Sequence, residues 1–340
     1  SNPELVSYTD DNRQQRWEAV RQAAEAVMNL GYKLYDVDAD RVTNFANIFL
    51  KNSDEQIFIT KYDKINFPEY WGTDWVMIYE PGTFGGYSLN QVTGNLANAF
   101  ENADGTDFDF AVQSDAPYLN RDPRFYATIL SEGTEWKYPD WNYWAMMPYT
   151  VHCGRWVNAD GATVSIGGDY YSGGANTGYY IRKFIDSDVF QYYYGDRQHH
   201  PYIQIRYAEV LLNYAEACIA LGREDDARSA INQLRKRAGM PDITDTGEAL
   251  VGRYRNERRV ELAWEQHRFF DVRRWMIASE AYVPAKGVDI IYPVEGSTDN
   301  PVYKETVVEQ RAWNVSHYLV PIGRNEMQKN QALIQNPGYN

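Results

Sequence analysis

The sequence contains little that would mark a redox, metal or membrane protein. Its two cysteines, Cys153 and Cys218, have a separation that fits no metal-ligand spacing and leaves their pairing open. Cys218 falls within a helical pattern, which favours a buried and unreactive thiol. No apolar run reaches the length of a membrane span. No signal peptide is visible, which indicates a cytoplasmic, mature or trimmed chain.

Positive charge is also in short supply. The 340 residues include 33 Lys and Arg against 47 Asp and Glu, a formal net charge of −14 at pH 7. A broad surface for polyanions is therefore not expected, and nucleic acid is not an expected partner. Hydrophobic residues make up 44% of the chain, which is enough to build a folded core.

Motifs for cofactors are incomplete. The adjacent His199 and His200 point different ways in most backbones, so a metal shared by both is not expected. The Gly-rich segment 168–178 lacks the Lys and Ser/Thr of a phosphate-binding loop. No EF-hand spacing is present, although the Asp- and Asn-rich loops leave calcium open. We expect no cofactor.

Aromatic residues, in contrast, are abundant and unevenly placed. The chain has 28 Tyr, 13 Phe and 10 Trp, and residues 61–200 hold six of the ten tryptophans. The same region is rich in Gly, Asn, Asp and Pro and shows no sustained helical period, which predicts a loop-rich region with short elements. Its densest stretch is WKYPDWNYW, residues 136–144. Pro139 and the irregular aromatic spacing exclude an ordinary helix with one buried face, so some rings should reach the surface.

Exposed aromatic rings beside polar side chains suit the binding of sugars. The C–H faces of a sugar pack on aromatic planes, and its hydroxyls need donors and acceptors. The candidate ligand-binding residues come from this stretch and from a second one at 69–80: Trp136, Trp141, Tyr143, Trp144, Asp140, Asn142, Trp71, Trp75 and Asp74. Trp136, Trp141 and Trp144 are the leading stacking candidates. The alternative is that these tryptophans form a small core beneath the loops.

Helical periodicity is strong on both sides of the loop-rich region. Residues 10–31 predict a helix with Trp17 on its apolar side, and 55–60 predict a short strand. One apolar face continues from Tyr202 to a turn at Gly222, and a second helix follows and ends at Gly239. Two antiparallel helices with a Gly turn and a closing Pro are typical of a tetratricopeptide repeat. One repeat cannot bury its own face, so other helices must pack on it.

The stretch ERRVELAWEQHRFFDVRRW, residues 257–275, combines dense charge with bulky apolar residues. On a helix, opposite charges would alternate along one face: Arg258, Glu261, Glu265 and Arg268. Arginine neighbours keep carboxylates ionised, which does not suit a general acid. The pattern therefore favours a scaffold helix tied to its neighbours by charge, over a catalytic carboxylate pair or a docking surface for a partner.

Six segments, in this order along the chain, resemble the SusD/RagB family of surface glycan-binding lipoproteins. They are NRDPRFYATI (120–129), TGYYIRKF (177–184), RYAEVLLNYAEACIALG (206–222), INQLRKRAGMP (231–241), the stretch 257–275, and YLVPIGRNEMQKNQALIQNPGY (318–339). AFENADGTDFD (99–109) fits more loosely. Arg121, Asp122 and Arg124 could be taken for catalytic residues. The same motif recurs in this non-enzymatic family, which favours an ion pair that stabilises a turn.

The resemblance implies a mainly α fold, a tetratricopeptide-like helical repeat scaffold with a loop-rich region that carries a few short β-strands. The expected divisions are a helical portion with a short strand (1–60), the ligand-binding loop region (61–200), the repeat helices with the charged helix (201–282), and a C-terminal extension packed on the scaffold (283–340). Family members begin with a lipidated cysteine and additional helices, so this chain should cover roughly the last two thirds of the pattern and expose apolar helix surface.

The function implied is the binding of an oligosaccharide at the cell surface and its delivery to a SusC-like TonB-dependent outer-membrane transporter. Membrane association would run through an N-terminal lipid anchor that this chain does not contain. Two alternatives remain at this point: a glycoside hydrolase with an aromatic-lined cleft, and a peptide-binding repeat protein. The location of the aromatics in loops speaks against the second of these.

Overall fold

The structure is a computed structural model that describes residues 8–61, 78–79, 81–84, 86–140, 145–171, 176–188 and 200–339. Helices dominate these residues. The α-helices are α2 (Arg13–Met28), α3 (Arg41–Leu50), α5 (Gly94–Ala97), α6 (Phe110–Gln113), α7 (Pro123–Thr128), α8 (Tyr207–Ala220), α9 (Glu224–Ala238), α10 (Gly247–Glu261), α11 (Arg268–Arg274), α12 (Ala278–Ala281) and α13 (Arg324–Lys329). The prediction of a mainly α fold with a few short strands is confirmed. None of the described helices is both long and apolar enough to cross a bilayer.

Helices α8 and α9 form the predicted antiparallel hairpin. Gly222 takes a left-handed φ of 73° in the turn between them, and Gly239 ends α9 with a φ of 78°. Both conformations favour glycine because it has no Cβ to clash with the backbone. The amide of Met240 donates to the carbonyl of Arg235 at 2.8 Å, which closes the last turn of α9.

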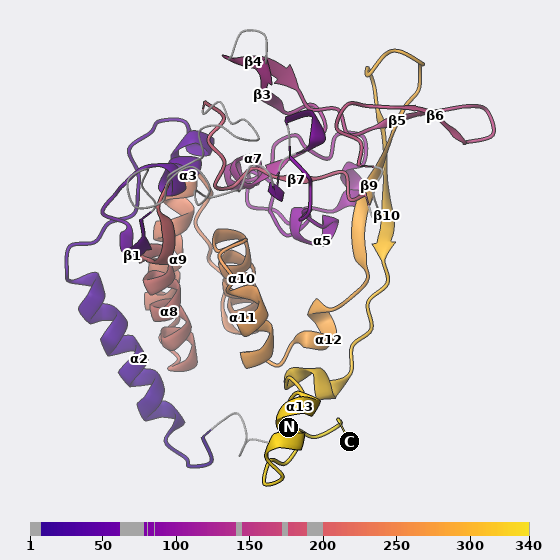
Figure 1. Ribbon diagram of the computed structural model, residues 1–340. Coiled ribbons are helices and arrows are strands. Elements are labelled where there is room, and N and C mark those ends of the chain that lie inside the picture. The colour runs from indigo at the N-terminus through magenta and orange to yellow at the C-terminus, as the bar shows by residue number, and fades with distance from the viewer. Residues whose placement is uncertain are drawn as a thin grey trace.

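Other helices cover the hairpin, as a single repeat requires. In Figure 1, α2 lies along the outer side of α8, and α10 lies on the opposite side of the α8–α9 pair. Their shared apolar core includes Ala24 from α2, Leu211 from α8, Leu234 from α9 and Leu250 from α10. The predicted helix around Trp17 is thus confirmed as a scaffold element.

Short sheets surround this helical layer. The strands are β1 (Gln56–Thr60), β2 (Ile129–Leu130), β3 (Glu135–Asp140), β4 (Ala145–Thr150), β5 (Arg155–Val157), β6 (Thr163–Ile166), β7 (Tyr180–Ile181), β8 (Tyr202–Arg206), β9 (Ala285–Tyr292) and β10 (Val302–Glu309). Four of them form a sheet in the order β10-β9-β5-β6, in which β5 and β9 run parallel; the other pairs are β1-β8, β2-β7 and β3-β4. Figure 1 shows the four-stranded sheet on the side of the molecule opposite α2.

A second hydrophobic core lies beneath these sheets. It joins Phe100 and Phe125 to Ile181 and Ile290, and it also takes in Val260 of α10. The same helix contributes Tyr254 to the core of the repeat helices. Helix α10 therefore forms the wall between the scaffold core and the core of the loop-rich region.

The helix predicted from Tyr202 begins later than its apolar pattern suggested. Residues 202–206 form β8, which pairs antiparallel with β1 and places Ile205 opposite Phe58. Both side chains are exposed, at 42% and 58%. The prediction of a helix over 202–206 was wrong because the partner strand, far away in sequence, supplies hydrogen bonds that a local period cannot reveal.

The charged stretch 257–275 is not one helix. Helix α10 ends at Glu261 and α11 begins at Arg268, with a turn between them. Trp264 and Gln266 have left-handed φ values of 65° and 67° in this turn. The predicted ladder of charges along one helical face is therefore wrong in its geometry.

Candidate functional site

The first part of the aromatic stretch predicted to bind ligand, residues 136–140, lies on β3, which pairs with β4 in a hairpin. The strands pair antiparallel from Glu135 opposite Thr150 to Asp140 opposite Ala145. Figure 1 places this hairpin at one edge of the molecule, away from α8, α9 and α10. The hairpin therefore lies at the periphery of the molecule.

Trp136 is buried, in contrast to the prediction that made it a leading stacking candidate. Its side chain is 7% exposed and belongs to the hydrophobic core of the loop-rich region. The guanidinium carbon of Arg182 lies 4.9 Å from the centroid of the Trp136 ring. An indole held in this way has no open face for a sugar, so Trp136 fits the alternative of a core tryptophan.

The other candidate side chains lie outside the described part of the structure. They are Trp71, Asp74, Trp75, Asp140, Asn142, Tyr143, Trp141 and Trp144. Their assignment to a ligand site stays a prediction.

Buried polar groups fix the base of the β3–β4 hairpin. The hydroxyl of Tyr149 on β4 donates to Asp169 at 2.9 Å, and the amide of His152 donates to the same carboxylate at 2.8 Å. Asp169 is only 2% exposed, and this burial raises the pKa of its carboxyl group. Phe84 packs edge-on against the ring of Tyr149, with their centroids 5.3 Å apart. Asp169 lies in the Gly-rich segment considered above for phosphate, and the structure gives it a role in anchoring the hairpin.

A second buried carboxylate, Glu132, supports the neighbouring strands. It accepts hydrogen bonds from the amide of Cys153 at 2.6 Å and from the hydroxyl of Tyr292 at 2.9 Å. This contact links the segment after β4 to the end of β9. Cys153 and Cys218 are both free and buried, and burial raises the pKa of each thiol. These supporting roles could not be predicted from local sequence patterns, because the partners lie on segments far apart in the chain.

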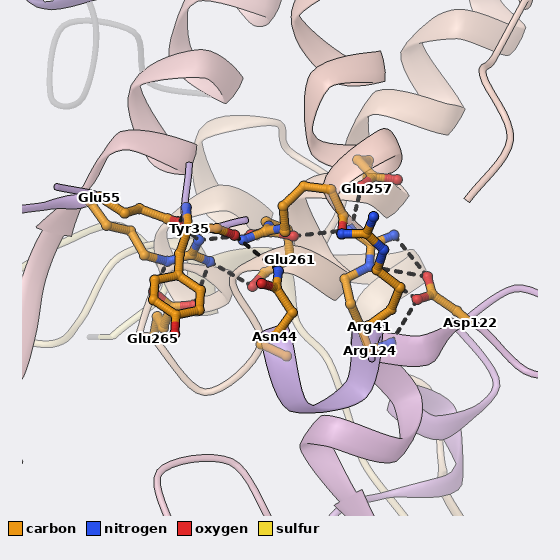
Figure 2. A network of polar contacts seen from close by, with 12 residues as sticks. Tyr35, Arg41, Asn44, Glu55, Asp122, Arg124, Glu257, Glu261 and Glu265 are labelled. Carbon is orange, nitrogen blue, oxygen red and sulfur yellow. Dashed lines mark hydrogen bonds and ion pairs between the residues drawn. The ribbon is translucent and has the colours of Figure 1, made fainter. Parts of the chain in front are cut away.

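The carboxylates of the charged stretch lie in a buried network of ion pairs. Glu261 is fully buried; it accepts from Arg206 at 2.7 Å and from Arg124 at 3.0 Å, and it also pairs with Arg237. Figure 2 shows Glu261 between Glu257, Arg124 and Glu55, with side chains from several elements converging on it. Its partners come from α7, β8 and α9, not from its own helix.

The neighbouring glutamates are held in the same way. Glu257 pairs with Arg124 and, at 3.0 Å, with Arg235. Glu265 pairs with Arg206 at 2.7 Å and with the buried Lys183 at 2.8 Å. The predicted scaffold role of this stretch therefore agrees with the structure, while the predicted partners within the stretch do not occur.

The two arginines of the predicted ladder are used elsewhere. Arg258 pairs with Asp271 at 2.8 Å and donates to Asn213 at 2.9 Å. Arg268 begins α11, beyond the turn that interrupts the stretch.

Electrostatics keep these carboxylates ionised. Burial alone would raise the pKa of Glu261, but Arg237, Arg206 and Arg124 together lower it well below its usual range. The pKa of Glu257 and of Glu265 is lowered by the balance between burial and the same kind of cationic neighbours. A carboxylate that is fully buried and stays ionised near neutral pH can neither reach a glycosidic oxygen nor protonate it.

The polar residues at 121–124 stabilise a turn of the scaffold, as predicted, and they also make contacts beyond this turn. Asp122 caps α7 by accepting from the amide of Arg124 at 2.8 Å and pairs with the guanidinium of the same residue at 2.7 Å. Arg121 instead donates to three backbone carbonyls, those of Pro117, Ala97 and Phe100. The predicted ion pair at this turn is confirmed, and Arg124 also extends it into the buried network.

No cluster of three or more His, Cys, Asp or Glu side chains among the described residues could hold a metal ion. His200 lies 3.3 Å from Asp186, and His199 lies outside the described residues.

Comparisons with known proteins agree on one family. A family model described as the SusD family matches residues 24–339. The curated SusD-like protein P2 from Formosa agariphila is 32% identical over 150 residues, which cover 41% of this chain and 26% of that protein. The chain thus spans about a quarter of that relative.

Solved structures show the same fold. A SusD-like protein from Bacteroides fragilis superposes with a TM-score of 0.75 at 31% identity, covering 96% of this chain and 63% of that one. A SusD-like carbohydrate-binding protein from the same species gives 0.70 at 24% identity, covering 95% and 62%. The surface glycan-binding protein A of Bacteroides thetaiotaomicron gives 0.57 at 19% identity, covering 96% and 60%. The chain spans less than two thirds of each. Because the family model matches nearly the whole of it, the chain belongs to the SusD family.

Proposed function

We propose that this protein binds oligosaccharide nutrients at the cell surface. The observation that carries the proposal is the match to the SusD family over residues 24–339. Two of the similar solved structures are named as carbohydrate- or glycan-binding proteins. The peripheral β3–β4 hairpin supports a ligand surface in the loop-rich region, because its two strands flank residues 141–144 in the sequence and its base is fixed by buried hydrogen bonds. The proposed stacking residues are Trp141 and Trp144, with Trp71 and Trp75 as second candidates.

Replacing Trp141 or Trp144 by alanine is expected to weaken oligosaccharide binding by about 30-fold, because a stacked indole at a binding hot spot is often worth about 2 kcal/mol. The melting temperature should stay near that of the unchanged protein. Isothermal titration against a panel of soluble neutral oligosaccharides and a thermal melt on the same sample measure both quantities.

Trp136→Ala provides the matched contrast within the same hairpin. Since Trp136 is buried in the core, its removal should cost about 3–5 kcal/mol of stability. The proposed stacking surface would be wrong under one outcome. In that outcome an oligosaccharide binds the unchanged protein, and the alanine variants at 141, 144, 71 and 75 all bind it with the same affinity.

We further propose that the bound oligosaccharide passes to a SusC-like TonB-dependent outer-membrane transporter, and that the full-length protein is lipid-anchored at the outer membrane. Family membership supports this proposal. The expected result is co-purification of the full-length protein with such a transporter from detergent-solubilised outer membranes. Its recovery without any TonB-dependent transporter, under conditions that preserve other outer-membrane complexes, would contradict the proposal.

We also propose that the protein is not an enzyme. The carboxylates that first suggested a hydrolase, Glu261 and Glu265, are enclosed by guanidinium and ammonium groups. No reducing ends should accumulate when the protein is incubated with any oligosaccharide that it binds. Catalytic turnover that survives Glu261→Gln would point to a hydrolase site elsewhere and overturn this part of the proposal.

A further inference from the structure

A cleft lies between the segment 98–108 and the first turns of α10, in the described part of the chain. Its volume is about 540 Å³, within the range of small-molecule sites. Asn256 on α10 donates to the carbonyl of Ala99 at 2.8 Å and so joins the two walls. The cleft is lined by residues that belong to neither the β3–β4 hairpin nor the aromatic stretch at 69–80.

Small residues open the cleft on the α10 side. Ala249 and Gly252 lie three positions apart on the helix and both line the cleft. A Cβ added at Gly252 would meet no atom within 4 Å. Glycine in a helix interior is destabilising, and Gly252 has no left-handed φ that would require it. The space beside Gly252 is therefore open enough to admit a side chain.

A fixed arginine stands among three carboxylates in the cleft. Arg253 donates through Nη1 to Glu101 at 2.6 Å and to Asp107 at 3.1 Å, and its Nε lies 3.6 Å from Asp245. Glu101 is buried and is held from behind by Arg235 at 2.9 Å. Among the described residues, none accepts a hydrogen bond from Nη2 of Arg253, and none donates to the second carboxylate oxygen of the exposed Asp107. The cleft thus presents preorganised donors and acceptors together.

An aromatic ring completes the lining. The guanidinium of Arg121 lies 3.5 Å from the ring centroid of Phe108, and Arg121 is itself fixed by three backbone carbonyls. Phe108 is therefore held firmly at the wall of the cleft. The guanidinium covers one face of the Phe108 ring, but the ring is only half-buried, unlike that of Trp136, and lines the cleft. The cleft therefore has aromatic surface beside charged hydrogen-bonding groups, which suits the C–H face and the hydroxyls of a sugar.

The charge of the lining narrows the ligand class. Glu101, Asp107 and Asp245 outnumber Arg253, so an anionic ligand such as a uronate would meet net repulsion. We propose that this cleft is a second saccharide site, which takes a neutral sugar unit. The inference rests on the proposed function, and it concerns a surface separate from the hairpin. A long glycan that reaches both sites would gain affinity through linkage of the two contacts.

Filling the cleft tests the inference. Gly252→Trp places an indole in the open space, and Gly252→Ala is the matched control that leaves most of the space free. Titrations use soluble neutral oligosaccharides of glucose, galactose, mannose or xylose, with oligogalacturonate as the anionic comparison. Gly252→Trp should weaken binding of at least one neutral oligosaccharide by about tenfold or more, while Gly252→Ala stays within about twofold.

A cysteine at the same position reports on the cleft alone. Since both native cysteines are buried, Gly252→Cys supplies an accessible thiol whose maleimide labelling should slow when a neutral oligosaccharide occupies the cleft. Ala159→Cys, at an exposed turn, should label at the same rate with and without sugar. If sugars bind but Gly252→Trp leaves their affinity unchanged and they do not slow the labelling of Gly252→Cys, the cleft proposal is wrong and the proposed function stands. If no sugar binds the unchanged protein, both fall.

Discussion

Replacing Glu261 by glutamine is expected to lower the free energy of unfolding by about 3–5 kcal/mol. The substitution keeps the shape of the side chain but removes the charge that Arg124, Arg206 and Arg237 share. These guanidinium groups are themselves buried and would then lack full compensation. Urea denaturation followed by circular dichroism measures the loss.

Glu248→Gln is the control on the same helix. Glu248 is exposed in the first turn of α10, so its neutralisation should cost less than about 1 kcal/mol. Oligosaccharide affinity, measured on folded protein, should be the same in both variants. Equal stability of the two variants would show that the buried charge of Glu261 stabilises the fold no more than an exposed charge does.

Acidification is expected to remove much of the stability of the protein, and the buried network of ion pairs predicts the pH range in which this loss occurs. The pKa values of Glu257, Glu261 and Glu265 are lowered in the folded state from an ordinary value of 4.5. The unfolded chain therefore takes up protons at these positions first as the pH falls. Their contribution to stability is complete above about pH 4.5 and is lost as the pH drops through the lower values of the folded state.

Each unit by which folding lowers the pKa of a carboxyl group corresponds to about 1.4 kcal/mol of stability. The three coupled carboxylates should therefore make the free energy of unfolding strongly dependent on pH. The urea midpoint should be nearly constant from pH 7 to pH 5 and fall steeply below it. Glu261→Gln should show a shallower decline, because one of the three groups no longer titrates. A midpoint that is unchanged down to pH 3 would contradict the assignment.

The scaffold was predictable from the sequence where local rules decide the outcome. The apolar period of α8, the turn at Gly222 and the end of α9 at Gly239 all depend on neighbouring residues. Prediction failed where a distant strand intervened, as at Ile205, whose partner Phe58 lies on β1. It also failed at Trp264, since the left-handed φ in that turn is unfavourable for tryptophan and is maintained by the surrounding structure.

The partners of the buried charges could not be predicted for a related reason. Spacing rules assign each glutamate to arginines three or four positions away. Glu261 instead pairs with side chains 24, 55 and 137 positions away in the chain. Within a sequence, an arginine at the surface and one in a core look the same. Trp136 shows the same limit for aromatic residues, because the sequence of an aromatic stretch does not reveal which of its rings is buried.

These separations have a consequence for how the chain folds. Glu55 reaches Arg206 across 151 positions and Arg237 across 182. Closing such long loops has an entropic cost that is met before the contacts form, so we expect folding to be slow. During synthesis, Glu55 cannot pair with Arg206 or Arg237 until residues beyond 206 have left the ribosome, and Arg124 cannot pair with Glu257 until later still. The amino-terminal half of the chain therefore cannot complete its core before the carboxyl-terminal half arrives.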